Sequence, residues 1–238
     1  RALYADYRGP LYQLKQSDGK TKDVSVNEAG YADAASHDSF CGHGTCVMQR
    51  IYDQTPMGNH LDPAPASTAR YGKQDRCPRQ KPATPVDAMK HKIMVGSHHA
   101  YGAWFEECNH YRNDATKGVA VGNQEESMYM VTSSGKRFND CCFDYGNGET
   151  NNLDDGDGTV EAIHFGDAHW QGNTGAGKGP WVSADFENGN VSTLSNKPLT
   201  HDFVTAVLKG RSDSFALLGG DAASGPLQTM YDGPRPTP

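Results

Sequence analysis

The chain has 238 residues, 36% of them hydrophobic and 21% charged, and its formal net charge is −7. This length allows one large domain or two small ones, and the acidic balance argues against nucleic acid or an anionic membrane surface as a partner. No apolar run approaches 18 residues, which excludes a transmembrane helix.

Six cysteines give the first structural signal, because an even number suits an oxidised, secreted protein. Cys41 and Cys46 flank a Gly-His-Gly-Thr turn that a small disulfide loop can close. A zinc site is the alternative, since His43 lies between the two cysteines. The spacing is poor for zinc and no second close pair supplies further ligands, so the disulfide is favoured over a metal.

Regular elements are weakly marked in the next part of the chain. Asp62–Pro85 is rich in proline and polar residues without periodicity, which predicts a long surface loop. The best candidate for a helix is the short segment around Val86–Met94, directly after this loop. Neither a fixed-period repeat nor a clear linker is visible, so we expect a single domain over residues 1–238.

Short strand-like segments, separated by Gly, Asn, Asp and Pro clusters, dominate the second half. They are Ser127–Thr132, Thr159–Phe165, Trp181–Glu187, Phe203–Leu208 and Ser214–Leu218. Turn-rich stretches at Asn147–Gly158 and Gly172–Pro180 lie between them. Many short strands with this punctuation predict an all-β protein, an antiparallel sandwich or barrel.

The segment Trp181–Glu187 carries the strongest chemical signal. Alternation places one set of side chains on a single face, namely Trp181, Ser183, Asp185 and Glu187. The intervening apolar side chains enter a core. An exposed ring beside two acids suits a sugar, and glycoside hydrolysis commonly uses a pair of carboxylates. The plainer alternative, a solvated face with scattered acids, fits the same pattern.

Other motifs are less specific. Cys141 and Cys142 either bond to each other, forming a rigid ring, or pair elsewhere. Asn190-Val-Ser is an N-glycosylation sequon, which fits secretion. The acid-rich Asn152–Gly158 lacks EF-hand spacing, and neither an HExxH motif, a P-loop nor a GxSxG elbow is present. No metal and no cofactor are therefore expected.

Two segments resemble a known family. Trp181-Val-Ser-Ala-Asp-Phe-Glu-Asn-Gly189 is similar to the nucleophile segment of the fungal α-L-arabinofuranosidases of glycoside hydrolase family 54. Asn139-Asp-Cys-Cys-Phe-Asp-Tyr-Gly-Asn147 is similar to its vicinal-disulfide segment. Further agreement is found at Arg1–Tyr4, Leu11–Gln13, Ile51–Gln54, Gly58–Leu61, Gly219–Gly225 and Arg235–Thr237. The similarity runs from end to end and is weakest at Asp62–Val95.

The resemblance implies a concanavalin-like antiparallel β-sandwich of the jelly-roll type. It implies a secreted, retaining hydrolase that releases terminal α-L-arabinofuranosyl residues from arabinoxylan or arabinan during hemicellulose degradation. Glu187 falls on the nucleophile position, Asp185 and Asn188 fall on sugar-binding positions, and Trp170 resembles an aromatic that packs in the sugar pocket. The expected partner is a polysaccharide or oligosaccharide with a terminal furanose, either arabinofuranose or galactofuranose.

Three disulfides are predicted: Cys41–Cys46, Cys141–Cys142 and Cys77–Cys108. The first two match the family, where the vicinal pair of Cys141 and Cys142 lines the sugar pocket. The third matches no cysteine pair of the family and is our own prediction for the two cysteines that remain.

The resemblance also shows departures. The family's general acid/base is an Asp in a Gly-Gly-Asp motif downstream of the segment that matches Arg235–Thr237, so it is expected beyond Pro238. Gly219-Gly220-Asp221 also occurs in the family and is not that acid. The family's domain begins with a cysteine pair before Arg1. We therefore expect a sandwich incomplete at both termini, with a further chain or segment as a candidate to complete it.

These departures leave two functions open. The first is the hydrolase, with Glu187 as nucleophile and an acid supplied from outside these residues. The second is a non-catalytic glycan-binding or structural module of an extracellular assembly, because loss of general acid catalysis lowers rates by about 10²–10⁴-fold.

Overall fold

The computed structural model describes the chain except residues 43, 67–80, 136–141, 149–159, 168–174, 187–189, 192–195 and 236–238, and of residues 142, 190 and 191 it describes the backbone alone. The chain divides into two compact units, which we call the first unit (Arg1–Val119 with Thr150–Leu153) and the second unit (Ala120–Glu149 with Asp154–Pro238). The expectation of one domain over the whole chain stays a prediction.

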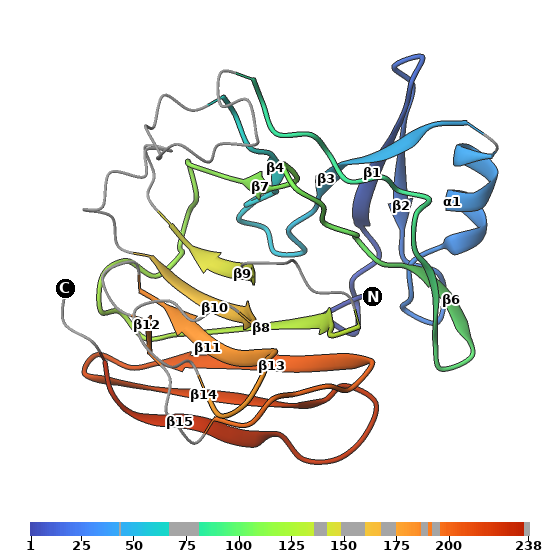
Figure 1. Ribbon diagram of the computed structural model, residues 1–238. Helices are drawn as coiled ribbons and strands as arrows, with labels where there is room; N and C mark the ends of the chain where they lie inside the picture. Colours follow the sequence, from blue (N-terminus) through green and yellow to red (C-terminus); the bar gives the residue numbers. More distant parts are fainter. Residues whose placement is uncertain are drawn as a thin grey trace. The chain divides into compact units, whose positions relative to one another are not determined.

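A three-stranded antiparallel sheet is the main element of the first unit (Figure 1). Its order is β2-β1-β3, with β1 (Pro10–Gln16), β2 (Thr21–Ser25) and β3 (Cys46–Ile51). Two pairs of short strands accompany it, β4 (Asp62–Pro63) with β7 (Tyr111–Arg112) and β5 (Lys92–Val95) with β6 (His98–Tyr101). A small apolar core forms where the sheet packs against the segment after Pro85: Leu14, Val24, Cys41, Cys46, Met48, Val86 and Ala88.

The helix α1 (Ala34–Cys41) also belongs to the first unit and was not predicted from the sequence. Asp33 caps its first turn by accepting a hydrogen bond from the Ser36 amide at 3.1 Å, which satisfies one of the free N–H groups there. The helix ends at Gly42, whose φ of 51° lies in the left-handed region that glycine tolerates. The predicted Cys41–Cys46 disulfide is present and joins the end of α1 to the start of β3.

The predicted helix around Val86–Met94 is wrong. The Met48 amide donates to the Val86 carbonyl at 3.0 Å, and the Ala88 amide donates to the Cys46 carbonyl at 2.9 Å. This segment therefore runs alongside β3 as extended chain before it enters β5. Its two buried apolar side chains, at positions 86 and 88, fit an extended period of two.

The predicted loop Asp62–Pro85 is described only at its ends. Its first two residues form β4, and the Ala83 amide donates to the carbonyl of buried Ala64 at 2.8 Å. The two described ends of this segment therefore lie together.

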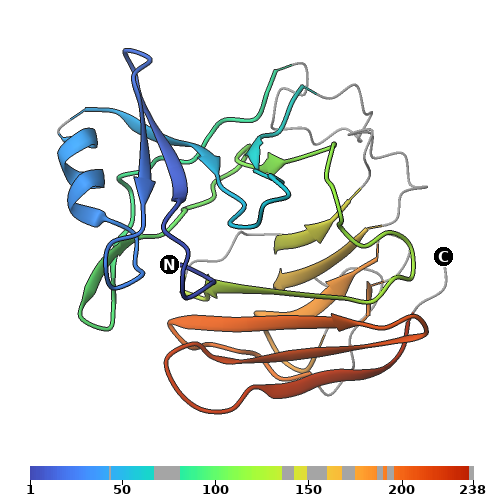
Figure 2. The same ribbon diagram turned by 180° about the vertical axis from the view of Figure 1, so that it is seen from behind.

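Two four-stranded antiparallel sheets form the second unit, and Figures 1 and 2 show them as separate layers. One has the order β15-β14-β13-β8, with β8 (Glu126–Ser133), β13 (Phe203–Gly210), β14 (Ser214–Asp221) and β15 (Gln228–Pro234). The other has the order β12-β11-β10-β9, with β9 (Cys142–Asn147), β10 (Glu161–Gly166), β11 (Trp181–Asp185) and β12 (Asn190–Val191).

Apolar side chains from both sheets meet in one core. It contains Met130, Ile163, Phe165, Val182, Ala184, Leu199, Val204, Ala206, Leu208, Phe215, Leu217 and Met230. Such facing of two sheets defines a β-sandwich, so the predicted all-β, antiparallel sandwich class is confirmed. All five predicted strands coincide with strands of this unit, namely β8, β10, β11, β13 and β14.

Candidate active site

Strand register divides the β9–β12 sheet into two faces. Ile163 pairs with Ala184 and Tyr145, and these positions lie on the core side with Val182 and Phe165. The opposite face is built from the alternate positions. In register across β11, β10 and β9 these are Asp185, Ala162 and Gly146; Ser183, His164 and Asp144; and Trp181, Gly166 and Cys142. The predicted sugar-binding residue Asp185 thus lies on the face turned away from the core.

Asp185 is half-buried and ends β11. Its neighbours in register are Ala162 on β10 and, beyond it, Gly146 on β9. Both are small, and a Cβ atom at Gly146 would lie 2.5 Å from the Cα atom of Ala162, so the two backbones approach closely there. This end of the face therefore presents a carboxylate with only small residues in register on β10 and β9, while its register partner on β12 is Asn190.

Asp144 and His164 form a polar pair on the same face. Nδ1 of His164 lies 2.8 Å from an oxygen of Asp144, so Nδ1 carries the proton and donates it in this hydrogen bond. The His164 side chain is buried, while that of Asp144 is 37% exposed. The sequence analysis did not predict this pair. The available signal was Asp144 itself, a polar residue between the aromatic residues Phe143 and Tyr145 in the segment 139–147.

The prediction that Trp181 presents its ring to a ligand is wrong. The side chain is fully buried, and its indole N–H donates to the Ala176 carbonyl at 3.1 Å. A Cβ atom at Gly175 would lie 2.5 Å from the Trp181 ring, and one at Gly179 would lie 2.8 Å from it. The glycine-rich stretch therefore covers the ring, because only residues without a side chain can approach it so closely.

Several predicted site residues lie outside the described residues: Glu187, Asn188, Trp170 and Cys141. The backbone of Cys142 begins β9 and that of Asn190 begins β12. The proposed roles of these residues stay predictions, as does the vicinal disulfide.

Cys108 is disulfide-bonded. Its predicted partner, Cys77, lies outside the described residues, so the Cys77–Cys108 pairing stays a prediction. Cys108 itself has a positive φ of 72°, which is uncommon for a residue with a side chain.

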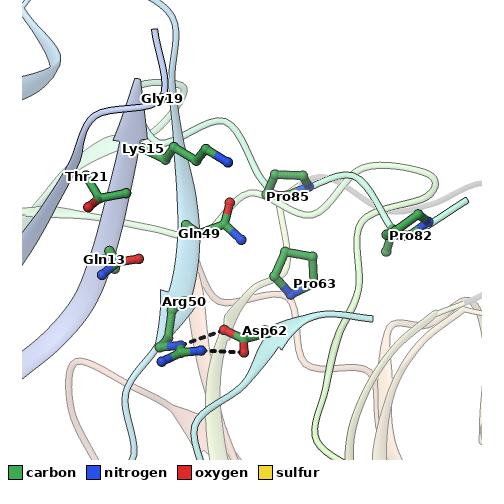
Figure 3. Close-up of a pocket in the computed structure, with 11 residues that line it drawn as sticks. Gln13, Lys15, Gly19, Thr21, Gln49, Arg50, Asp62, Pro63, Pro82 and Pro85 are labelled. Carbon is green, nitrogen blue, oxygen red and sulfur yellow. Dashed lines mark hydrogen bonds and ion pairs between the residues drawn. The ribbon is translucent and has the colours of Figure 1, made fainter. Parts of the chain in front are cut away.

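The first unit carries an open hollow of about 590 Å³ (Figure 3). Its lining is Gln13, Lys15, Gly19, Thr21, Gln49, Arg50, Asp62, Pro63, Pro82, Ala83 and Pro85. Arg50 and Asp62 form a two-bonded ion pair in it, with both N–O distances 2.7 Å. The lining contains neither an aromatic ring for stacking nor a second carboxylate beside Asp62, so it does not supply the carboxylate pair that glycoside hydrolysis needs.

Within the described ranges, no cluster of three or more His, Cys, Asp or Glu side chains is arranged to bind an ion. In the same part of the chain, no helix combines the length and apolar character needed to cross a membrane.

Comparison with known proteins identifies the family. Residues 1–238 match the family model described as "Alpha-L-arabinofuranosidase B, catalytic". A probable α-L-arabinofuranosidase B of Aspergillus flavus is 42% identical over 245 residues, an alignment that covers 100% of this chain and 47% of that protein. An α-L-arabinofuranosidase of Hypocrea jecorina is also 42% identical, with 99% and 47% covered. The chain thus spans about half the length of these relatives.

Solved structures agree with this assignment. One is a GH54 α-L-arabinofuranosidase soaked with a cyclic sulfate inhibitor, with a TM-score of 0.90, 38% identity, and 99% of this chain and 50% of that chain covered. Another is an arabinofuranosidase complexed with arabinofuranosyl-α-1,2-xylobiose, with a TM-score of 0.88, 37% identity, and 99% and 49% covered. The chain therefore belongs to the α-L-arabinofuranosidase B catalytic family of GH54.

Proposed function

We propose that this chain provides the nucleophile and sugar-binding face of a retaining glycoside hydrolase that releases terminal α-L-arabinofuranosyl residues from arabinoxylan- or arabinan-type polysaccharides. The observation that supports it most is the position of Asp185. It ends β11 on the face away from the core, with small Ala162 as its partner on β10, and Glu187 follows two residues later in the sequence.

The first step of the proposed reaction uses Glu187. Two residues along an extended strand return to the same face, so Glu187 is expected beside Asp185. Its carboxylate attacks the anomeric carbon of the bound arabinofuranosyl group, and a covalent glycosyl ester forms as the glycosidic C–O bond breaks. The leaving oxygen takes a proton from a general acid, which we expect from the family resemblance to lie beyond Pro238. Asp185 accepts hydrogen bonds from the sugar hydroxyls, and the amide of Asn188 donates or accepts them.

The second step returns the enzyme to its starting state. The same acid, now deprotonated, removes a proton from water, and that water attacks the anomeric carbon of the ester. The ester bond breaks, arabinose leaves, and Glu187 is again a carboxylate. Two displacements at one carbon give retention of configuration.

The test separates the role of Glu187 as nucleophile from the role of the general acid. Release of 4-nitrophenolate from 4-nitrophenyl α-L-arabinofuranoside needs no proton donor for the leaving group, so the chain should complete the first step, a burst of one 4-nitrophenolate per chain, without a general acid. Glu187→Gln should lower the rate about a thousandfold or more, since a catalytic group is removed. The matched control is Glu28→Gln, which changes an exposed carboxylate of the first unit.

Equal rates for the native chain and Glu187→Gln would overturn the assignment of Glu187. An inactive native chain that still binds an arabinofuranosyl oligosaccharide would instead favour the non-catalytic glycan-binding module.

Secretion is part of the proposal. The Cys41–Cys46 disulfide is present, and disulfides persist in oxidising compartments. The sequon at Asn190 is expected to carry an N-glycan. Enzymatic removal of N-glycans from the natively produced protein should reduce the mass of the peptide that contains Asn190, and an unchanged mass would contradict glycosylation there.

A further inference from the structure

The buried Glu161, the half-buried Glu126 and Arg235 meet at one end of the second unit. Glu126 begins β8, Glu161 begins β10 and Arg235 directly follows β15. Arg235 forms an ion pair through Nη1 with Oε2 of Glu161, and the two side chains are only 6% and 5% exposed. The pair joins the two sheets of the sandwich, because Glu161 and Arg235 come from different sheets.

Two atoms of this cluster have no hydrogen-bond partner among the described residues, Oε1 of Glu161 and Nη2 of Arg235. Both lie over Gly210 of β13, where a Cβ atom would be 2.7 Å from the first and 2.8 Å from the second. Gly210 pairs in register with Glu126. The cluster therefore occupies space that is free only because residue 210 is a glycine. Any side chain at this position would displace the ion pair.

Glu126 adds a proton to the cluster. Burial, and then the nearby Glu161 carboxylate, raise the pKa of Glu126 to about 7. Asn147 on β9 donates to Oε2 of Glu126 at 2.9 Å. When protonated, Glu126 can donate a hydrogen bond to Glu161, whose Oε1 is the acceptor left over. Once Glu126 ionises, its half-buried carboxylate and the buried carboxylate of Glu161 face a single guanidinium.

The cluster also lies beside the side chain of Phe186, the residue before the proposed nucleophile in the sequence. The guanidinium of Arg235 lies over the ring of Phe186, 5.9 Å from its centroid. Phe186 also packs against Phe215 in the core, with ring centroids 4.9 Å apart. Glu161 is followed by Ala162, the cross-strand partner of Asp185. The cluster thus holds both the residue after Asp185 and the strand beside it.

We propose that Arg235, held by Glu161 and Glu126, is a positioning residue that fixes Phe186 from the core side and thereby orients Asp185, two residues before the proposed nucleophile Glu187. This inference rests on the proposed function, because it assigns Glu187 the role of nucleophile. Because Phe186 stands between Asp185 and Glu187 in the sequence, a shift of its side chain is expected to displace the backbone of both neighbours. The groups that face the cluster are Glu126 from β8, Asn147 from β9, Glu161 from β10, Gly210 from β13 and Arg235.

The experiment measures covalent labelling of the chain by a cyclic sulfate of α-L-arabinofuranose. A carboxylate nucleophile opens this reagent at the anomeric carbon and retains the whole molecule as an adduct, with the sulfate half-ester still attached to the sugar. The reaction needs no general acid. Its rate, followed by intact mass against reagent concentration and pH, separates binding from the bond-forming step.

Arg235→Met should lower the maximal labelling rate about 10- to 100-fold with little change in the reagent concentration at half-maximal rate, since a misplacement near 1 Å can cost about 10²-fold. Arg235→Lys should recover part of the loss. Glu125→Gln is the matched control, because it removes the charge of an exposed carboxylate next to Glu126 in the sequence. All variants are compared well below their unfolding temperatures.

Glu126→Gln covers the case in which Arg235→Met fails to fold, because an amide keeps the shape and the donor of a protonated carboxyl. The native labelling rate should fall as pH rises through about 7, and Glu126→Gln should remove this fall. Unchanged rates in folded Arg235→Met, or an unchanged pH profile in Glu126→Gln, would overturn the inference alone. An unlabelled native chain would overturn the proposed function itself, and the inference with it.

Discussion

The imidazole of His37 stacks on the ring of Tyr101, with ring centroids 3.7 Å apart and planes inclined by 14°. The hydroxyl of Tyr12 lies 2.8 Å from Nδ1 of the same histidine, and His37 is fully buried. One side chain of α1 thus contacts β1 and β6. Asp38, the next residue, receives hydrogen bonds from Tyr101 and from Lys92, the latter at 2.7 Å. The helix is held to the first unit by these contacts as well as by its disulfide.

Burial gives this histidine a defined effect on stability. It lowers the pKa of His37 from 6.5 to about 4. Between these values the unfolded chain binds more protons, so the free energy of unfolding should fall as pH drops from 6.5 to 4, by at most about 3 kcal/mol. Urea unfolding at several pH values measures this. His37→Leu should flatten the dependence, whereas the exposed control His99→Leu should not; equal slopes would contradict the prediction.

Glu126 should change the free energy of unfolding in the opposite direction, over a pH range that overlaps that of His37. Its pKa is raised from 4.5 to about 7, so the folded state binds more protons between these values. The contribution of Glu126 is fully favourable below pH 4.5 and is lost as pH rises through about 7. Thermal unfolding of Glu126→Gln should lose this decline, and a decline as steep as that of the native chain would rule out Glu126 as its source.

Much of the second unit was accessible from the sequence, because alternation is a local property. β13 alternates buried side chains with more exposed ones, and β8 alternates half-buried with exposed side chains over most of its length. The predicted helix at Val86–Met94 failed for a different reason: Val86 and Ala88 are buried by pairing with β3, which lies some 40 residues earlier. Propensity within one segment cannot indicate such a partner.

The helix α1 is the opposite case, a helix that is present but was not predicted from the sequence. Its sequence, Ala-Ala-Ser-His-Asp-Ser-Phe-Cys, has little apolar periodicity, and its stability depends on contacts with distant residues such as Tyr101. The Asp33 cap was the one local signal. A charged cluster assembled from positions 126, 161 and 235 was likewise beyond any local pattern. The motif at Asp185 was found because the family resemblance is carried by contiguous residues.

The Cys41–Cys46 disulfide should stabilise the first unit measurably. It closes a short loop, and the chain-entropy estimate for such a loop is about 2 kcal/mol. Cys41→Ala combined with Cys46→Ala should lower the free energy of unfolding by about this amount or more, since both side chains are also buried. Urea unfolding of the double variant, with reductant absent, makes the comparison. An unchanged value would show that the bond contributes nothing.

Gly210 offers a test of the cluster that changes no charge. A methyl group there would meet Glu161 and Arg235 at less than 3 Å, so Gly210→Ala should displace the ion pair and lower stability by about 1–3 kcal/mol. Gly135→Ala is the matched control in the same unit, because its Cβ atom would contact only Ser133, at 3.7 Å. Similar unfolding temperatures for the two variants would contradict the proposed crowding at Gly210.

The central claim is that Glu187 of this chain is a nucleophile, and the most direct measurement locates the covalent adduct. The chain is incubated with the arabinofuranose-configured cyclic sulfate, digested, and analysed by tandem mass spectrometry. We predict one adduct, on the peptide that contains Asp185 and Glu187, with fragment ions that assign it to Glu187, and no adduct in Glu187→Gln. An adduct on another carboxylate, or equal labelling of Glu187→Gln, would contradict the account.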